Sequence, residues 1–229
     1  MGSLLDREAV LRSDIVANST MNRSRGLAGG NSYAKDLRFD ILAWLVERHR
    51  AKGGVTWYDV CCGEGRALIQ AAAALADLGL SNARLIGVDL VPVFAETRSG
   101  VSLQAGDAAQ FAPEPPPDLI TCVHGIHYIG DKLGLLAHLA GLLASDGILV
   151  ANLDPQNVRI ADTAKPGWAA IARAAGPARS RLSYKDHILR IGGGGWLAFD
   201  VAYRGASRSE TPNYTGIIVM DSWYEREGA

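Results

Sequence analysis

The sequence VTWYDVCCGEG occupies residues 55–65. It opens with β-branched and aromatic residues typical of a buried strand, and this apolar run ends in an acid, Asp59. A tight turn with Gly63 and Gly65 follows, and the alanine-rich stretch over residues 66–78 has the composition of a helix. A strand, a loop of small residues and a helix start form, in this order, the arrangement that brings backbone close to a ligand in α/β proteins.

Asp59 restricts the chemistry of that ligand. The free backbone N–H groups at a helix start favour anionic phosphate, and a carboxylate beside them would repel the pyrophosphate of a dinucleotide. Asp59 suits a ligand with a cationic end, such as S-adenosylmethionine, which has an ammonium and a sulfonium and no phosphate. An NAD-dependent oxidoreductase is disfavoured further, because Leu68 stands where the dinucleotide motif has its third glycine.

Two more acids follow the next two predicted strands. The second strand ends at Asp89, with Leu90 next, and an acid at this tip can accept hydrogen bonds from both hydroxyls of a ribose. The third strand is followed by Asp107 and Ala108. A single acid at a strand end is often only a turn residue or a helix cap. Three acids at three successive strand ends favour an adenosine-containing ligand.

In these residues and their order, the chain resembles the class I S-adenosylmethionine-dependent methyltransferases. Residues 59–65, DVCCGEG, are similar to the first motif of that family, although Cys61 stands where the family most often has glycine. A positive φ would be strained at a cysteine, so Gly63 and Gly65 are the better candidates for close approach. The resemblance is close over residues 53–154 and implies that the cofactor S-adenosylmethionine contacts Tyr33, Asp59, Cys61, Gly63, Gly65, Asp89, Leu90, Asp107, Ala108 and His124.

The candidate catalytic residues follow the fourth predicted strand. His124 comes directly after it, and residues 126–128, Ile-His-Tyr, are similar to the end of the family's fourth motif, near which the family places the transferred methyl. His127 is a candidate general base, with His124 as a second candidate, because a neutral imidazole can take a proton from a hydroxyl or amine. The alternatives are that His127 orients the loop as a packed residue and that His124 contacts the cofactor through its backbone. We expect structural roles for His49, His138 and His187.

Strands alternating with helices predict an α/β fold with a doubly wound, mostly parallel sheet. The family implies seven strands in a Rossmann-like methyltransferase fold with an antiparallel C-terminal edge. We expect that edge to be a hairpin of residues 187–191 and 196–203 around four glycines. Segments 155–181 and 203–215 are then insertions, at least one of which walls the substrate pocket. The expected strands of the core are residues 55–59, 84–90, 101–105, 118–123 and 148–154.

The N-terminal part of the chain has a different composition. Residues 22–33 are polar and glycine-rich, which fits either a flexible leader or a lid over cofactor and substrate, with Tyr33 and two arginines as candidate contacts. An amphipathic helix is expected next, with its apolar positions at Leu37, Ile41, Trp44 and Leu45. We therefore expect a single domain over residues 1–229, with an N-terminal lid (1–52), a cofactor-binding core (53–154) and a substrate-side C-terminal part (155–229).

The composition of the chain disfavours several classes of function. The net charge of −1 gives no general attraction for nucleic acid, and no apolar run is long enough to cross a bilayer. Three cysteines without paired spacing predict neither a metal site nor disulfides, which favours a reducing cytoplasm. We expect a monomer or homodimer that methylates O, N or C of a small molecule, in bacterial specialised metabolism. The alternative is a cyclase or isomerase that binds the same cofactor without transferring its methyl.

Overall fold

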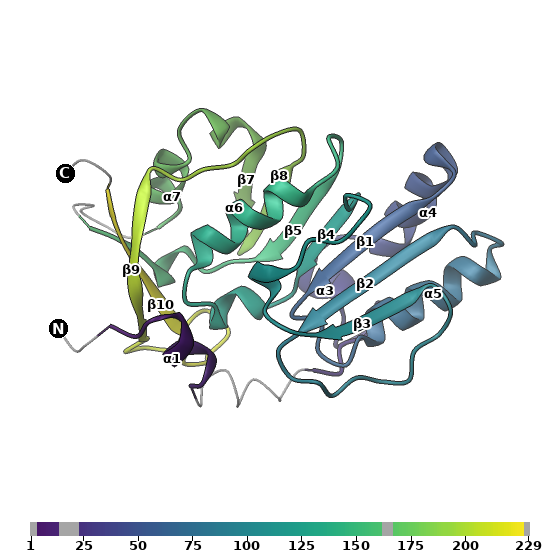
Figure 1. Ribbon diagram of the computed structural model, residues 1–229, viewed down its shortest axis with the longest axis horizontal. Helices are drawn as coiled ribbons and strands as arrows, with labels where there is room; N and C mark the ends of the chain where they lie inside the picture. The colour runs from purple at the N-terminus through teal and green to yellow at the C-terminus, as the bar shows by residue number, and fades with distance from the viewer. Residues whose placement is uncertain (1–3, 14–22, 162–166, 227–229) are drawn as a thin grey trace.

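The computed structural model describes residues 4–13, 23–161 and 167–226. Its main sheet has seven strands in the order β3-β2-β1-β4-β5-β8-β7 (Figure 1). The five strands β3, β2, β1, β4 and β5 are parallel to one another, whereas β8 is antiparallel to both β5 and β7. The predicted doubly wound, mostly parallel sheet with an antiparallel element at its C-terminal end is therefore confirmed. The strands are β1 Val55–Val60, β2 Ala83–Asp89, β3 Val101–Ala105, β4 Leu119–Cys122, β5 Ile148–Asn152, β7 Leu182–Lys185 and β8 Ile188–Gly192.

Helices cover both faces of this sheet, because consecutive strand residues point to opposite sides. On β1, Trp57 packs into one core cluster and Tyr58 into the other. The Trp57 side carries α3 (Tyr33–Leu37), α4 (Ile41–Lys52) and α5 (Arg66–Asp77), and the Tyr58 side carries α6 (Lys132–Leu142) and α7 (Trp168–Ala174) (Figure 1).

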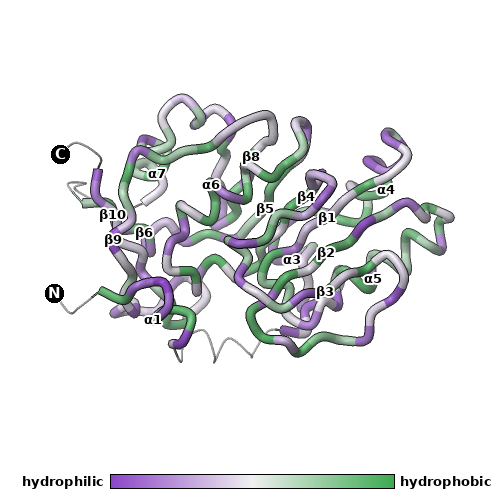
Figure 2. The backbone as a smooth tube through the Cα atoms, in the orientation of Figure 1, coloured by the Kyte–Doolittle hydropathy of each residue, from purple (hydrophilic) through white to green (hydrophobic). Residues whose placement is uncertain are grey.

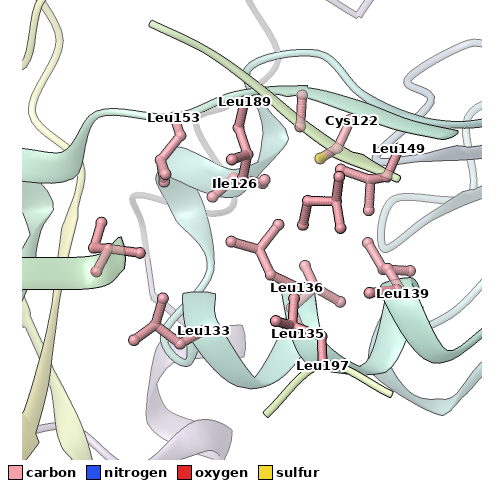
Figure 3. Packing of buried hydrophobic residues seen from close by; sticks show 14 of the residues in the cluster. Cys122, Ile126, Leu133, Leu135, Leu136, Leu139, Leu149, Leu153, Leu189 and Leu197 are labelled. Carbon is pink, nitrogen blue, oxygen red and sulfur yellow. The ribbon is translucent and has the colours of Figure 1, made fainter. Parts of the chain in front are cut away.

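The leucines of α6 form the centre of the larger cluster. Leu136 and Leu139 face Leu149 and Leu189 of the sheet, and Ile126 lies in the middle of the cluster, between Leu189 and Leu136 (Figure 3). Hydrophobic residues accordingly concentrate along β4 and β5, while α1 (Arg7–Leu11) begins with two charged residues and ends with apolar ones (Figure 2). Among the described residues, no helix combines the length and the apolar character that crossing a bilayer requires.

The single helix expected around Leu37 is two helices. Arg38 ends α3 in the left-handed region, at φ 46°, and the side chain of Asp40 then caps α4 by accepting from the Ala43 N–H. The break lets α3 lie against β5 while α4 packs on β1. It also turns Tyr33, the first residue of α3, towards the C-terminal end of β1.

The prediction of a hairpin around Gly192 to Gly195 is wrong. The strand that forms a hairpin with β8 is β7. The two-residue turn between them consists of Asp186 and His187, both at positive φ (51° and 63°). This is the backbone pattern of a type I′ turn. Gly193 donates to the Gly147 carbonyl, and the chain then leaves the main sheet.

The segments expected to be insertions contribute to a second sheet. Its order is β6-β10-β9, with β6 Val158–Ile160, β9 Val201–Arg208 and β10 Met220–Arg226. The N-terminal segment packs against it, since Leu5 and Ala206 exchange backbone hydrogen bonds of 2.7 and 2.9 Å and α1 contacts β9 (Figure 1). Residues far apart in the sequence thereby meet beside the ends of the parallel strands.

Candidate active site

A cavity of about 920 Å³ lies at the C-terminal ends of β1, β2, β3 and β4. Its volume is within the range of small-molecule sites. The loops after these strands form its floor, and the N-terminal segment and the second sheet form its walls. Of the residues predicted from sequence, those that line it are Tyr33, Cys61, Gly63, Asp89, Leu90, Asp107, His124 and His127. Asp59, Gly65 and Ala108 are not part of its lining.

Asp59 lies beneath the cavity wall. Its carboxylate is fully buried and accepts one hydrogen bond from the Tyr33 hydroxyl (2.7 Å) and one from the Thr121 hydroxyl (2.5 Å). Burial raises the pKa of Asp59 to about 7, although the two hydroxyl bonds oppose the rise. Asp59 therefore holds Tyr33 in the wall, and Tyr33 is the residue that faces the cavity.

The loop after β1 takes the conformation that small residues permit. Cys61 and Gly63 both have left-handed backbone, at φ 58° and 61°, and both line the cavity. A Cβ on Gly63 would lie 2.4 Å from the carbonyl oxygen of Arg23, so only glycine allows the N-terminal segment to cross here. Gly65 serves packing instead, because its Cβ would lie 2.5 Å from a methyl of Leu103.

Asp89 joins three elements at the floor of the cavity. Its Oδ2 accepts from the Gly63 N–H (2.9 Å), and its Oδ1 accepts from the Val91 N–H (3.0 Å). The guanidinium of Arg23 also donates to Oδ1, at 2.7 Å, and a second nitrogen of Arg23 donates to the Val91 carbonyl at 2.9 Å. Both side chains of this ion pair are about nine-tenths buried, with 9% and 10% exposed.

Asp107 has the same kind of partner. One oxygen caps the short 3₁₀ helix η2 (Ala108–Gln110) by accepting from the Ala109 N–H at 3.0 Å. The other oxygen pairs with the guanidinium of Arg7 from α1. Asp89 and Asp107 are the acids expected to bind the nucleoside, and each forms an ion pair with an arginine from the N-terminal part of the chain. Ala108 is buried, and Ala109 faces the cavity in its place.

His124 is held in a strained conformation at the end of β4. Its φ of 57° is unusual for a residue with a side chain, and such strain concentrates at functional sites. Its backbone N–H donates to the Asn152 side chain at 3.3 Å, and its Nε2 lies 3.5 Å from a carboxylate oxygen of Asp36. Although burial opposes it, His124 and Arg25 lower the pKa of Asp36, so this carboxylate is charged.

His127 lies in the 3₁₀ helix η3 (Gly125–Tyr128) and is 1% exposed. Burial, with nearby His124, Lys132 and His187, lowers its pKa well below the usual value, so the ring is neutral near pH 7. Its Nε2 lies 3.3 Å from the Tyr214 hydroxyl, while Nδ1 has no hydrogen-bond partner among the described residues. A neutral imidazole can accept a proton, and His127 lines the cavity.

The sequence did not predict one residue beside His127. Tyr214, in the loop between β9 and β10, stacks on His187 with ring centroids 3.7 Å apart and planes at 9°. His187 was expected to be structural, and Tyr214 lay in a segment treated as an insertion. The run Pro-Asn-Tyr-Thr-Gly over residues 212–216 could have indicated an ordered turn, but no local pattern links it to His127.

No group of three or more His, Cys, Asp or Glu within residues 4–13, 23–161 and 167–226 is placed to hold a metal ion. Acceptor groups for an adenosine-containing cofactor are present in Asp89, Asp107 and the loop containing Gly63. His124 and His127 line the same cavity as these acceptor groups.

Comparison with known proteins supports the same family. Trans-aconitate 2-methyltransferase of Methylobacterium radiotolerans is 33% identical over 104 residues, which are 44% of this chain and 38% of that protein. The enzyme of the same name from Methylobacterium nodulans is 30% identical over 135 residues, 55% of this chain and 50% of that protein. The chain thus matches half or less of the length of these curated relatives.

A solved structure shares the fold. Magnesium protoporphyrin IX methyltransferase from Synechocystis, crystallised with S-adenosylmethionine, superposes with a TM-score of 0.52 at 18% identity, covering 84% of this chain and 100% of that chain. A family model described as a methyltransferase domain matches residues 30–187. Since this match spans more than half of the sequence, the chain belongs to the methyltransferase-domain family.

Proposed function

We propose that the protein transfers a methyl group from S-adenosylmethionine to a small molecule. The observation that carries the proposal is one cavity, in a methyltransferase fold, that combines nucleoside acceptors with a neutral imidazole. Asp89 ends β2 and Asp107 follows β3 on one side of this cavity, and His127 lies on its wall after β4. The curated relatives are methyltransferases by name, which agrees with this chemistry.

The cofactor fits the acceptors that the chain presents. Asp89 would accept from the ribose hydroxyls, Asp107 from the adenine amino group, and the backbone around Cys61 and Gly63 would contact the amino-acid part. Tyr33 lies beside that loop and is bonded to Asp59. Because the pKa of Asp59 is about 7, a nearby cationic ligand would favour its ionised form.

When bound, S-adenosylmethionine supplies a methyl group that is already electrophilic. The chain then has to hold the nucleophile in line, exclude water and, for an oxygen or nitrogen nucleophile, accept its proton. His127, which lines the cavity, is the proposed proton acceptor. His124, with its strained backbone and its contact to Asp36, is proposed to shape the wall beside it.

Anionic small molecules are the first substrates to test. The curated relatives are named for trans-aconitate, which is a carboxylate. Arg25 and Arg208 both line the cavity, Arg25 in an ion pair with Asp36. We also propose a cytoplasmic monomer or homodimer, organised as one domain, that serves bacterial specialised metabolism.

Titration calorimetry with S-adenosylmethionine, S-adenosylhomocysteine and NADH tests the cofactor. Binding of the first two, weakened about 10- to 150-fold by Asp89→Ala, would support the assignment. Strong binding of NADH alone would overturn it. Methyl transfer is then measured as S-adenosylhomocysteine formed with a panel of small carboxylic acids, phenols and amines. Turnover of a substrate without S-adenosylhomocysteine would instead identify a cyclase or isomerase.

A further inference from the structure

A second cavity, of about 890 Å³, adjoins the first. The lining residues that the two cavities share are Asp131, Gly134, His138 and Tyr203. The first three belong to α6 and its N-cap, and the fourth belongs to β9. The lining of the first cavity runs from His127 through residues 128–131 to α6, and the lining of the second continues along the same helix to Leu142. The two cavities therefore border each other along one helix.

The lining of the second cavity is mainly apolar. It comes from α6, from the segment between β8 and β9, and from the second sheet, and includes Leu133, Leu142, Leu197, Phe199, Val201 and Tyr224. The two titratable groups at the border of the cavities already have partners within the protein. Asp131 accepts from the Gly134 N–H (2.8 Å) and the Tyr224 hydroxyl (2.9 Å), and Nε2 of His138 lies 2.9 Å from the Phe111 carbonyl oxygen. A cavity of this volume and composition suits an apolar ligand.

Trp196 is presented to solvent at the second cavity. It lines this cavity and is 75% exposed. The backbone before it is fixed by Arg181, whose guanidinium donates to the carbonyls of Gly192, Gly195 and Trp196. The next residue, Leu197, is 1% exposed and packs in the cluster around α6 (Figure 3). An anchored backbone thus exposes a large apolar side chain, and covering that side chain with a ligand would be favourable.

Gly141 keeps the second cavity open on the side of α6. A Cβ at this position would meet no atom within 4 Å, so the packing of the protein does not require glycine there. Glycine within a helix is destabilising relative to alanine. Gly134 differs, because a Cβ there would collide with the carboxylate of Asp131, which caps the helix. The space over Gly141 is therefore available to a ligand, at a cost in the stability of the helix.

We propose that the second cavity binds an apolar arm, alkyl or aryl, of the molecule that accepts the methyl group. This proposal rests on the proposed methyltransferase function, which places the reacting end of that molecule in the first cavity beside His127. The acceptor is then amphipathic, with a polar end among the arginines and histidines of the first cavity and an apolar arm against Trp196. A second copy of the chain would need no border with the first cavity, whereas the four shared residues provide one.

Binding of straight-chain carboxylates, from butyrate to decanoate, tests the second cavity without any methyl transfer. Each buried methylene should lower Kd about fourfold until the cavity is full. The emission of Trp196, taken as the difference between wild type and Trp196→Phe, should shift to shorter wavelength as the arm covers the indole. In Gly141→Leu, Kd should stop falling at a shorter chain length, while butyrate binds as it does to wild type. Gly141→Ala is the matched control, because it removes the same glycine, adds little volume and should keep the wild-type dependence.

Two results would overturn the proposal. One is a chain-length dependence that is absent in wild type or equal in wild type and Gly141→Leu. The other is a wild-type dimer in sedimentation that Trp196→Ala converts to monomers, because a second copy of the chain would then cover the cavity. Failure of the proposed methyltransferase function would look different. It would appear as no binding of S-adenosylmethionine, with the chain-length dependence of the carboxylates intact.

Discussion

Replacing Arg23 by alanine is expected to increase the affinity for S-adenosylmethionine. A carboxylate offers about four acceptor positions. Asp89 already accepts from the Gly63 N–H, the Val91 N–H and the Arg23 guanidinium. The two hydroxyls of a ribose need two acceptor positions, and one remains while Arg23 is in place. The cofactor must therefore displace Arg23 or give up one hydrogen bond.

The size of the effect follows from the buried ion pair. Arg23 and Asp89 are 9% and 10% exposed and their contact is 2.7 Å, so solvent screens it little. A hydrogen bond to a charged group contributes about 1.5–3 kcal/mol, which corresponds to about a 10- to 150-fold change in affinity. We expect the lower end, about tenfold, because the backbone carbonyl of Arg23 still accepts from the Glu64 N–H in the variant.

Titration calorimetry on wild type, Arg23→Ala and Arg12→Ala measures this change. Arg12 is the matched control, since it is exposed on the same N-terminal segment and pairs with Glu8. Its variant should bind the cofactor like wild type. Weaker binding by Arg23→Ala would refute the reasoning and would mean that Arg23 contacts the cofactor. Unchanged affinity would show that Asp89 serves ribose with Arg23 still bound.

Three further predictions follow from the same geometry. Gly65→Val should lower the melting temperature, because its Cβ would lie 2.5 Å from Leu103 at a φ of 76°; a variant as stable as wild type in thermal denaturation would contradict this. Burial raises the pKa of Asp59 from 3.8 to about 7, so the folded state binds the extra proton and stability is lost as pH rises through that interval. Asp59→Asn should therefore gain stability relative to wild type between pH 5 and pH 8 in urea unfolding, and a constant difference would refute the shift. His127→Ala should reduce kcat about 10²- to 10⁴-fold with cofactor affinity unchanged, whereas near-normal turnover would make His127 structural.

The first five strands of the main sheet could be predicted because each carries its own signal. Each is a short apolar run, most are bounded by a turn residue, and the predicted third strand, residues 101–105, coincides with β3. The C-terminal part could not be predicted in the same way. Its turn is formed by Asp186 and His187, whereas four glycines nearby offered a stronger turn signal. The pairing of β9 with β10 depends on contacts across the second sheet that local sequence does not encode.

The candidate site could likewise be predicted only in part. Residues that end or follow a strand of the parallel sheet, such as Asp89 and His124, could be placed at one edge of the sheet from their spacing alone. Tyr214 and His127 are 87 positions apart, and only the folded chain brings them together. Arg23 is one of the two arginines expected as candidate contacts, but its pairing with Asp89 and that of Arg7 with Asp107 were not predicted, because both arginines come from outside the repeating strand–helix units.

The pairing of Leu5 with Ala206 has a consequence for how the cavity opens. This contact joins segments near opposite ends of the described residues, so forming it costs more chain entropy than any pairing within the parallel sheet. Segments joined by so few bonds exchange their amide hydrogens through local opening, at less free energy than global unfolding requires. The N-terminal segment can therefore separate from the second sheet while the seven-stranded sheet stays folded. Ligands would then enter when the N-terminal segment moves away from the second sheet. The strand ends with Asp89 and Asp107 would keep their spacing during this motion.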